Sequence, residues 1–266
     1  MRDSDYPHPN HLLAALMASG SERLLSGLEM VSLKFGDVLY ESESRIRHAY
    51  FPTTSIVSLV YMMEDGATDE IAAVGNEGII GVPIFMGSET TPSRAVVRCA
   101  GCAFRLKGHL LLDEFNKSMA VQQLLLRYTQ SLFAQISQTA ACNRHHSVHQ
   151  QLCRWLLSSL DRLPSNELKI THESIAGMLG VRRESVSKEA AELQSAGLIH
   201  NGRGRITVVD RRRLETRACE CYRGIKREFG RLLNPAAVPT YATDNVTVER
   251  HVPIPRAAQT QWSATA

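Results

Sequence analysis

The segment from Thr171 to Ile206 constrains the fold more than any other part of the chain. It reads THESIAGMLGVRRESVSKEAAELQSAGLIHNGRGRI. Two short helical patterns flank Gly180, which can adopt the positive φ of a tight turn. Thr171 suits the N-cap of the first helix, and Gly197 marks the end of the second. A turn sequence beginning at Asn201 then precedes an apolar strand, so the segment predicts a winged helix-turn-helix.

The polar side of the second predicted helix carries side chains suited to contact with DNA. Arg183 and Ser187 are one helical turn apart, and Glu184 and Lys188 have the same spacing. Both pairs point away from Val186, which we expect to be buried. Arginine can bind guanine with two hydrogen bonds, and glutamate can accept one from cytosine. The predicted DNA-contacting residues are Thr171, Arg182, Arg183, Glu184, Ser187, Lys188, Arg203 and Arg205.

Basic residues are concentrated around this segment. The chain as a whole has a net charge of +3, which is too small to indicate a nucleic-acid partner. Residues 182–217 contain nine basic and five acidic residues, a larger excess than that of the whole chain. A basic patch suits phosphate groups, and Arg203 and Arg205 on the predicted wing are placed to contact them. Charge alone fits a solvated surface equally well, so the prediction depends on where the helix places these charges.

Residues 31–106 show a different pattern. Short apolar, β-branched runs alternate with Gly, Pro, Asn and Asp, which is typical of an antiparallel sandwich or barrel. A single amphipathic helix is expected before this region, over residues 11–27. The expected strands are DVLY, HAYF, SIVSLVYMM, EIAAV, GIIGVPIF, RAVVRC and CAFRL.

Long helices are expected after the strands. Residues 110–141 carry two apolar stripes, of which one can pack on the β domain and the other on a second copy of the helix. Shorter helices are expected over 147–163, where Pro164 ends the pattern, and over 211–233. We assign the dimer seam to Val121, Leu125, Tyr128 and Leu132. The alternative seam is the second row, at Leu126, Phe133, Ile136 and Ala140.

The segments GVRRESVSKEAAEL and GLIHNGRGRITVVD resemble the Crp/Fnr family of bacterial transcription regulators, and the resemblance extends over about residues 24–233. It implies an N-terminal β-roll related to cyclic-nucleotide-binding domains, a dimer helix, a winged helix, and RNA polymerase as a partner. The family's base-reading Arg-Glu-x-x-x-Arg pattern falls on Arg183, Glu184 and Lys188, where lysine lacks the two-pronged geometry of arginine. Glu189 stands where the family usually has an apolar residue. Arg182 replaces a small N-capping residue.

The predicted fold class is α+β. It consists of an N-terminal antiparallel β-roll (a cupin-like jelly roll), a long dimerisation helix and a C-terminal winged helix-turn-helix. The expected domains are 1–110, 111–145 and 146–234, followed by a disordered tail over 235–266. We expect a homodimeric DNA-binding transcription factor, not an enzyme, that responds to a signal and acts on a palindromic operator. The alternative is a signalling module that binds a small ligand and has weak or no specific DNA binding.

The resemblance also suggests where a nucleotide pocket would lie. Cyclic-AMP-binding relatives carry Gly-Glu-Leu and, later, Arg-Ser. In this chain Gly81 and Val82 fall on the first motif, and Ser93 and Arg94 fall on the second in reversed order. A shift of one residue along a strand sends a side chain to the opposite face. We therefore expect no tight binding of cyclic AMP or cyclic GMP, no cofactor, and an effector that the sequence does not identify.

The six cysteines predict no metal site. Cys99 and Cys102 flank an expected turn, either as a redox pair or as small buried residues. The segment CNRHHSVHQQLC has Cys and His four residues apart, a spacing that could hold a metal on a continuous helix, but a polar hinge is expected there. Cys219 and Cys221, two apart on one predicted helix, should point to different faces. The absence of cysteine before Cys99 argues against the iron–sulfur cluster of the family's sensors.

The sequence also predicts where the protein is found. No apolar run reaches the roughly 18 residues that a membrane-spanning helix needs. The first residues, MRDSD, are too polar to begin a secretory signal. We therefore expect a cytoplasmic protein with reduced thiols and no membrane partner.

Overall fold

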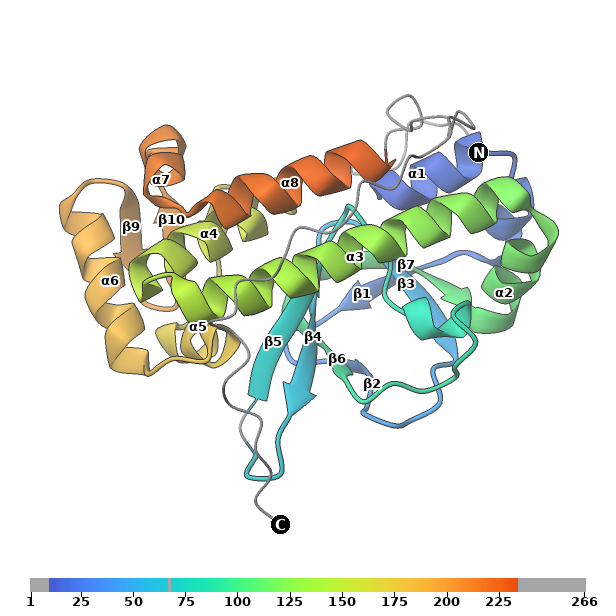
Figure 1. Ribbon diagram of the computed structural model, residues 1–266, viewed down its shortest axis with the longest axis horizontal. Coiled ribbons are helices and arrows are strands. Elements are labelled where there is room, and N and C mark those ends of the chain that lie inside the picture. Colours follow the sequence, from blue (N-terminus) through green and yellow to red (C-terminus); the bar gives the residue numbers. More distant parts are fainter. Residues whose placement is uncertain (1–9, 67, 234–266) are drawn as a thin grey trace, which may run out of the picture.

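The computed structural model describes residues 10–66 and 68–233. It shows an α+β chain in which the long helix α3 (Met119–His145) extends along the domain that contains two β-sheets and reaches a smaller helical domain at its C-terminal end (Figure 1). The predicted tail, 235–266, lies outside the described residues. Within the described ranges, no helix combines the length and the apolar character that crossing a membrane requires.

The N-terminal domain contains two antiparallel sheets. One has the strand order β1-β7-β3 and the other the order β2-β6-β4-β5, so the chain crosses from one sheet to the other at the turn between β6 and β7. This corner separates Cys99, at the end of β6, from Cys102 on β7, and both thiols are free. The strands are β1 (Glu29–Leu33), β2 (Val38–Tyr40), β3 (His48–Pro52), β4 (Ile56–Met62), β5 (Thr68–Val74), β6 (Arg94–Cys99) and β7 (Gly101–Lys107).

The prediction of a strand over GIIGVPIF is wrong. Only Ile80 pairs in an antiparallel bridge, with Tyr50, and the chain then forms a short 3-10 helix over Val82–Ile84. Gly81 has φ 110°, a conformation that other residues rarely adopt, and Pro83 has no backbone N–H to offer a strand. These two residues therefore turn the chain where the apolar pattern suggested that it would continue.

Three of the four helices predicted outside the helix-turn-helix are interrupted. Residues 11–27 form α1 (His11–Ala18) and a 3-10 helix (Glu22–Gly27). The expected helix over 110–141 is divided into α2 (Gly108–Lys117) and α3, because Ser118 has an extended backbone and caps α3. The expected helix over 211–233 is divided into α7 (Arg211–Arg217) and α8 (Glu220–Leu233). The expected helix over 147–163 is α4 (Val148–Leu160), whose N-terminus is fixed by a Ser147/Gln150 capping box.

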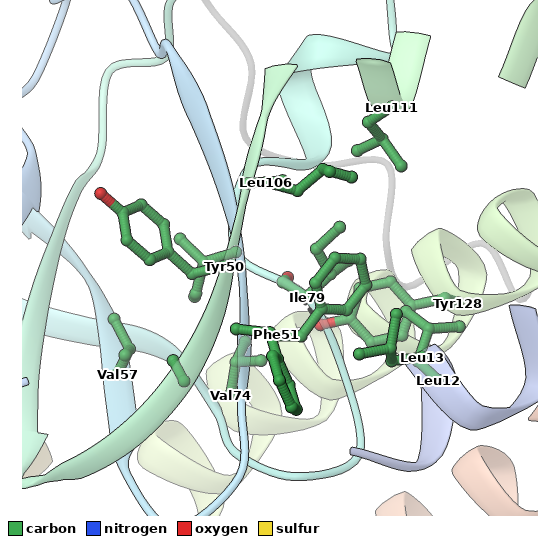
Figure 2. Packing of buried hydrophobic residues seen from close by; sticks show 14 of the residues in the cluster. Leu12, Leu13, Tyr50, Phe51, Val57, Val74, Ile79, Leu106, Leu111 and Tyr128 are labelled. Atoms are coloured by element: carbon green, nitrogen blue, oxygen red, sulfur yellow. Dashed lines mark hydrogen bonds between the residues drawn. The ribbon is translucent and has the colours of Figure 1, made fainter. Parts of the chain in front are cut away.

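The predicted dimer seam is wrong, because its residues are buried within the subunit. Tyr128 is 0% exposed, packs among Leu12, Leu13 and Phe51 in the core (Figure 2), and donates a hydrogen bond to the Ile79 carbonyl at 3.1 Å. The other three predicted seam residues are also buried: Val121 and Leu125 are fully buried and Leu132 is 6% exposed. The face that carries them covers the β-roll and cannot also meet a second subunit.

The opposite face of α3 is exposed, and the residues on it recur at regular intervals. We call it the α3 stripe, and its members alternate at intervals of four and three residues. Phe133 is 64% exposed and Leu126 is 45% exposed. Ile136, which the alternative seam included, packs against the core instead. Such spacing is the pattern of a helix that pairs with another helix. The stripe comprises Met119, Gln123, Leu126, Gln130, Phe133, Ser137 and Ala140.

The C-terminal domain has its own apolar core, built from α4, α5 (His172–Leu179), α6 (Arg183–Ser195) and a three-stranded sheet. The sheet has the order β8-β10-β9, with β8 (Glu167–Leu168), β9 (Ile199–Gly202) and β10 (Arg205–Val208). After this sheet the chain forms α7 and then α8, which returns along α3 (Figure 1). The ring of Phe229 on α8 lies 6.3 Å from the ring of Tyr128, so α8 reaches the first domain.

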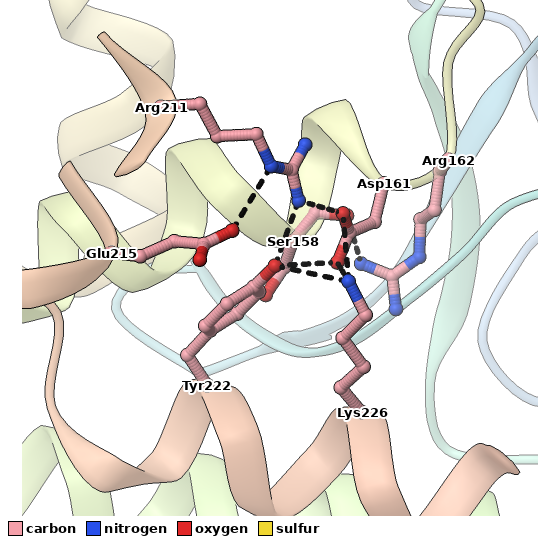
Figure 3. A network of polar contacts seen from close by, with 7 residues as sticks. All are labelled: Ser158, Asp161, Arg162, Arg211, Glu215, Tyr222 and Lys226. Carbon is pink, nitrogen blue, oxygen red and sulfur yellow. Dashed lines mark hydrogen bonds and ion pairs between the residues drawn. The ribbon is translucent and has the colours of Figure 1, made fainter. Parts of the chain in front are cut away.

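A polar network fixes α7 and α8 to the end of α4 (Figure 3). Asp161 accepts hydrogen bonds from Arg211 and, at 2.9 Å, from the Tyr222 hydroxyl, and Lys226 lies 3.3 Å from the same carboxylate. Burial, with the adjacent Asp161 charge, raises the pKa of Tyr222, so its hydroxyl remains a donor. Arg211 also pairs with Glu215 at 3.0 Å, so two basic groups and two carboxylates are paired at this junction.

A buried ion pair joins the two domains. Arg162, just after α4, donates from Nε to Oε1 of Glu77 at 2.7 Å, and the two side chains are only 8% and 15% exposed. The Arg162 stem lies against Gly75, where an added Cβ would come within 2.6 Å of it. The loop after β5 therefore supplies both the charge partner and the space for this arginine.

Candidate DNA-binding surface

The local signals in residues 171–206 are confirmed by the structure. The Thr171 hydroxyl accepts a hydrogen bond from the Ser174 N–H at 3.1 Å and caps α5. Gly180 has φ 63° and ends α5, and Gly197 has φ 72° after α6. Gly202 pairs with Arg205 across β9 and β10, which leaves a two-residue turn at the tip of the wing. These turns place α6 beside the wing.

The predicted base-reading side chains lie on the open face of α6. Arg183, Glu184 and Lys188 are all exposed in the first two turns of the helix. Arg183 lies 3.9 Å from Glu173, and Lys188 lies 3.9 Å from Glu192. At this length and exposure such ion pairs are weak, so both cations can exchange these partners for nucleic-acid acceptors.

The wing and the start of α5 border the same hollow. Thr171, Arg183 and Arg203 all line it. Arg205 is exposed on β10, 3.7 Å from Glu167. Arg182 is the N-cap of α6 and is exposed, and its side chain makes no capping hydrogen bond, as the departure from a small capping residue suggests. Seven of the eight predicted DNA-contacting residues are therefore exposed, and three of the seven line one hollow.

Ser187 is the eighth and has a different role. Its hydroxyl lies 3.0 Å from Nδ1 of His172, and Nε2 of that histidine lies 3.1 Å from Oδ1 of Asn201. When Nε2 donates to the Asn201 oxygen, Nδ1 can accept from the Ser187 hydroxyl. His172 thus connects α5, α6 and the wing strand β9. Sequence reasoning missed it, although its position directly after the helix cap was visible.

The structure also explains the charged residue at an expected apolar position. Glu189 points inward, and its Oε2 lies 2.9 Å from Nδ1 of His149 on α4. Both side chains are mostly buried, so the pair replaces the apolar contact that would otherwise join these helices. The pairing engages Nδ1 of His149 with Glu189.

A family comparison identifies this domain. Residues 150–217 match the family of Crp-like helix-turn-helix domains. The chain carries a Crp-like helix-turn-helix domain. No curated protein sequence matches the chain.

Solved structures extend the similarity from the Crp-like domain to the fold of the described chain. FixK2 from Bradyrhizobium japonicum is 16% identical, with a TM-score of 0.63, and the match covers 72% of this chain and 98% of that one. A Crp/Fnr-family protein from Eubacterium rectale is 19% identical, with a TM-score of 0.60 and coverage of 79% and 97%. The transcriptional regulator TTHA1359 from Thermus thermophilus is 24% identical, with a TM-score of 0.56 and coverage of 71% and 98%. The chain therefore has the β-roll, long helix and helix-turn-helix arrangement of Crp/Fnr proteins.

The predicted ligand-pocket residues do not form a free anion site. Arg94, at the start of β6, lies 3.3 Å from Glu41, which already compensates its charge. Ser93 is buried next to Thr91, with 3.3 Å between their hydroxyl oxygens. Gly81 and Val82 belong to the turn and the 3-10 helix described above. A phosphate would have to displace the Glu41 carboxylate to reach Arg94.

Proposed function

We propose that this chain is a homodimeric transcription factor that reads a palindromic operator with α6 and responds to a signal received by its β-roll. The observation that carries the proposal is the exposure of Arg183, Glu184 and Lys188 at the start of α6, beside the basic wing. A helix of this kind fits the major groove, where the residues of its first turns reach base edges. Arg203 and Arg205 are placed to contact phosphates on either side.

The α3 stripe supports the dimer. It leaves Leu126 and Phe133 exposed on a helix whose other faces are covered by the β-roll and by α8. Pairing of two such stripes about a twofold axis would bury these apolar side chains. It would also present two α6 helices to DNA, so the operator half-sites should be about 10–10.5 base pairs apart, or a multiple of that spacing.

Two substitutions should distinguish the residues that read bases from those that contact phosphates. Arg183→Ala should cost about 1–3 kcal/mol of binding to the specific site and relax preference at one base pair. Arg203→Ala should weaken binding to all sequences alike and reduce the salt slope by about one unit. Fluorescence anisotropy over a salt series measures both effects.

The control for this pair is Arg227→Ala, which removes an exposed arginine from α8, away from the wing. It should leave specific binding unchanged. Unchanged specific affinity in Arg183→Ala would refute the assignment of α6. The same titrations test the alternative of a ligand-binding module, since a regulator should prefer its site over random DNA by 10³-fold or more. The site itself would come from sequencing DNA selected by the purified protein.

The pocket geometry supports the proposal that cyclic AMP and cyclic GMP are not the effector. A ligand present at about 100 times its dissociation constant stabilises a protein by roughly 2.7 kcal/mol. We expect millimolar cyclic nucleotide to leave the thermal unfolding midpoint unchanged, because Glu41 holds Arg94. A clear rise in the midpoint that disappears in Arg94→Ala would contradict this expectation.

A further inference from the structure

Three buried cysteines and one histidine converge where α3 ends and α8 begins. Cys142, Cys219 and Cys221 are 0%, 4% and 1% exposed and form a cluster separate from both domain cores. His146, the residue after α3, completes the group. The four potential ligand atoms all lie within 4.8 Å of one another.

The interruption between α7 and α8 makes this convergence possible. Cys219 and Cys221 were expected to point to different faces of one helix, and that expectation is wrong. Ala218 has an extended backbone, with ψ 151°, and α8 begins only at Glu220. Cys219 therefore lies before the helix and Cys221 on its first turn, so both thiols can face the end of α3.

The distances suit one tetrahedral metal ion. The sulfur atoms of Cys142 and Cys219 are 3.6 Å apart, and the Cys221 sulfur lies 3.5 Å from Nδ1 of His146. With zinc–sulfur bonds of about 2.3 Å, the edge of a tetrahedron is about 3.8 Å. A disulfide requires about 2.05 Å and would engage only two of the four groups.

Two neighbouring side chains, Glu220 and Gln138, orient the potential ligand atoms of the cluster. Nε2 of His146 lies 3.2 Å from Oε1 of Glu220, which leaves Nδ1 directed at the thiols. Metal-binding histidines commonly have such a carboxylate partner. The Gln138 amide donates to the Cys221 sulfur at 3.0 Å, a contact that favours the thiolate. The thiolate is the form of cysteine that binds metal.

We propose that Cys142, His146, Cys219 and Cys221 bind one structural zinc ion. Three thiolates and one imidazole are a common closed zinc set with no open position for catalysis, and soft sulfur ligands select against magnesium and calcium. The contact between the thiols leaves no room for the inorganic sulfides of a cluster. The ion would connect the end of the long helix to the start of α8.

Metal analysis of the purified full chain tests the site. We expect one zinc per chain in the wild type, and none in Cys142→Ser or Cys221→Ser. Cys153→Ser is the matched control, because Cys153 is equally buried but lies on α4 outside the cluster and burial raises its pKa to about 12. His145→Asn controls for His146→Asn, since His145 is exposed at the same helix end.

A second measurement does not depend on how the variants fold. Titration of the native wild type with a mercurial should release one zinc as the cluster thiols react, and cobalt reconstitution should give the absorption of a tetrahedral thiolate site. A reduced wild-type chain that takes up neither zinc nor cobalt would overturn the proposal. A Cys142–Cys219 disulfide in metal-free protein, or stoichiometric iron in place of zinc, would also overturn it.

Discussion

Phe133→Glu is expected to convert the proposed dimer into a folded monomer that no longer binds the proposed operator. Phe133 is 64% exposed in the subunit, so the substitution removes no intramolecular core contact. In a twofold dimer it removes two aromatic side chains from the interface, each contributing about 1.5–3 kcal/mol, and adds two carboxylates there. A loss of about 4 kcal/mol corresponds to roughly a 10³-fold weaker dimer.

The adjacent residue provides the control. Leu132 is 6% exposed, and Leu132→Glu would place a carboxylate in the core beneath α3. It should lower the unfolding midpoint strongly, whereas Phe133→Glu should leave that midpoint near the wild-type value. Light scattering and circular dichroism on both variants separate the two results. A Phe133→Glu protein that remains dimeric would exclude the α3 stripe as the seam.

Glu77→Ala is expected to lower the free energy of unfolding by about 3–5 kcal/mol. The substitution leaves the Arg162 guanidinium at the interface between the domains without its carboxylate partner. Most of the cost is the desolvation of that unpaired charge, not the loss of the attraction itself. Urea unfolding monitored at several wavelengths measures the effect and tests whether the domains unfold together.

An exposed pair is the matched comparison for Glu77. The side chains of Arg45 and Glu89 are 67% and 65% exposed and lie 2.8 Å apart. Glu89→Ala should therefore cost at most about 1 kcal/mol. Restoring apolar packing in the double variant Glu77→Ala/Arg162→Met should recover much of the loss. Equal effects for Glu77→Ala and Glu89→Ala would contradict this account.

The sequence predicted those features that depend on short-range signals. Thr171, Gly180 and Gly197 are at the positions that the cap and the two turns require, so the helix-turn-helix was predictable almost residue by residue. The helix register that these signals define also predicted which residues of α6 are exposed. The interruption at Ala218 had no comparable signal, because no proline or glycine marks it. The convergence of Cys219 and Cys221 was missed for that reason.

The choice between the two stripes of α3 could not be made from the sequence. Both contain apolar residues at helical spacing, and hydrophobic periodicity does not specify which partner each face meets. Tyr128 appeared suitable for an interface, but its hydroxyl donates a hydrogen bond to the Ile79 carbonyl inside the subunit. The burial of one face depends on the packing of α1 and the β-roll, which are distant in sequence.

The return of α8 along α3 gives the C-terminal domain a second connection to the first domain, and the Arg162–Glu77 ion pair gives it a third. The chain enters the domain through the hinge at His146 and Ser147, and it leaves through α8, whose Phe229 contacts Tyr128 in the first domain. A rigid domain that is held at one point can rotate in any direction. A body tied at two points turns only about the line that joins them. The Arg162–Glu77 ion pair is a third contact between the domains, so a rearrangement that repositions α6 must break that pair or detach α8.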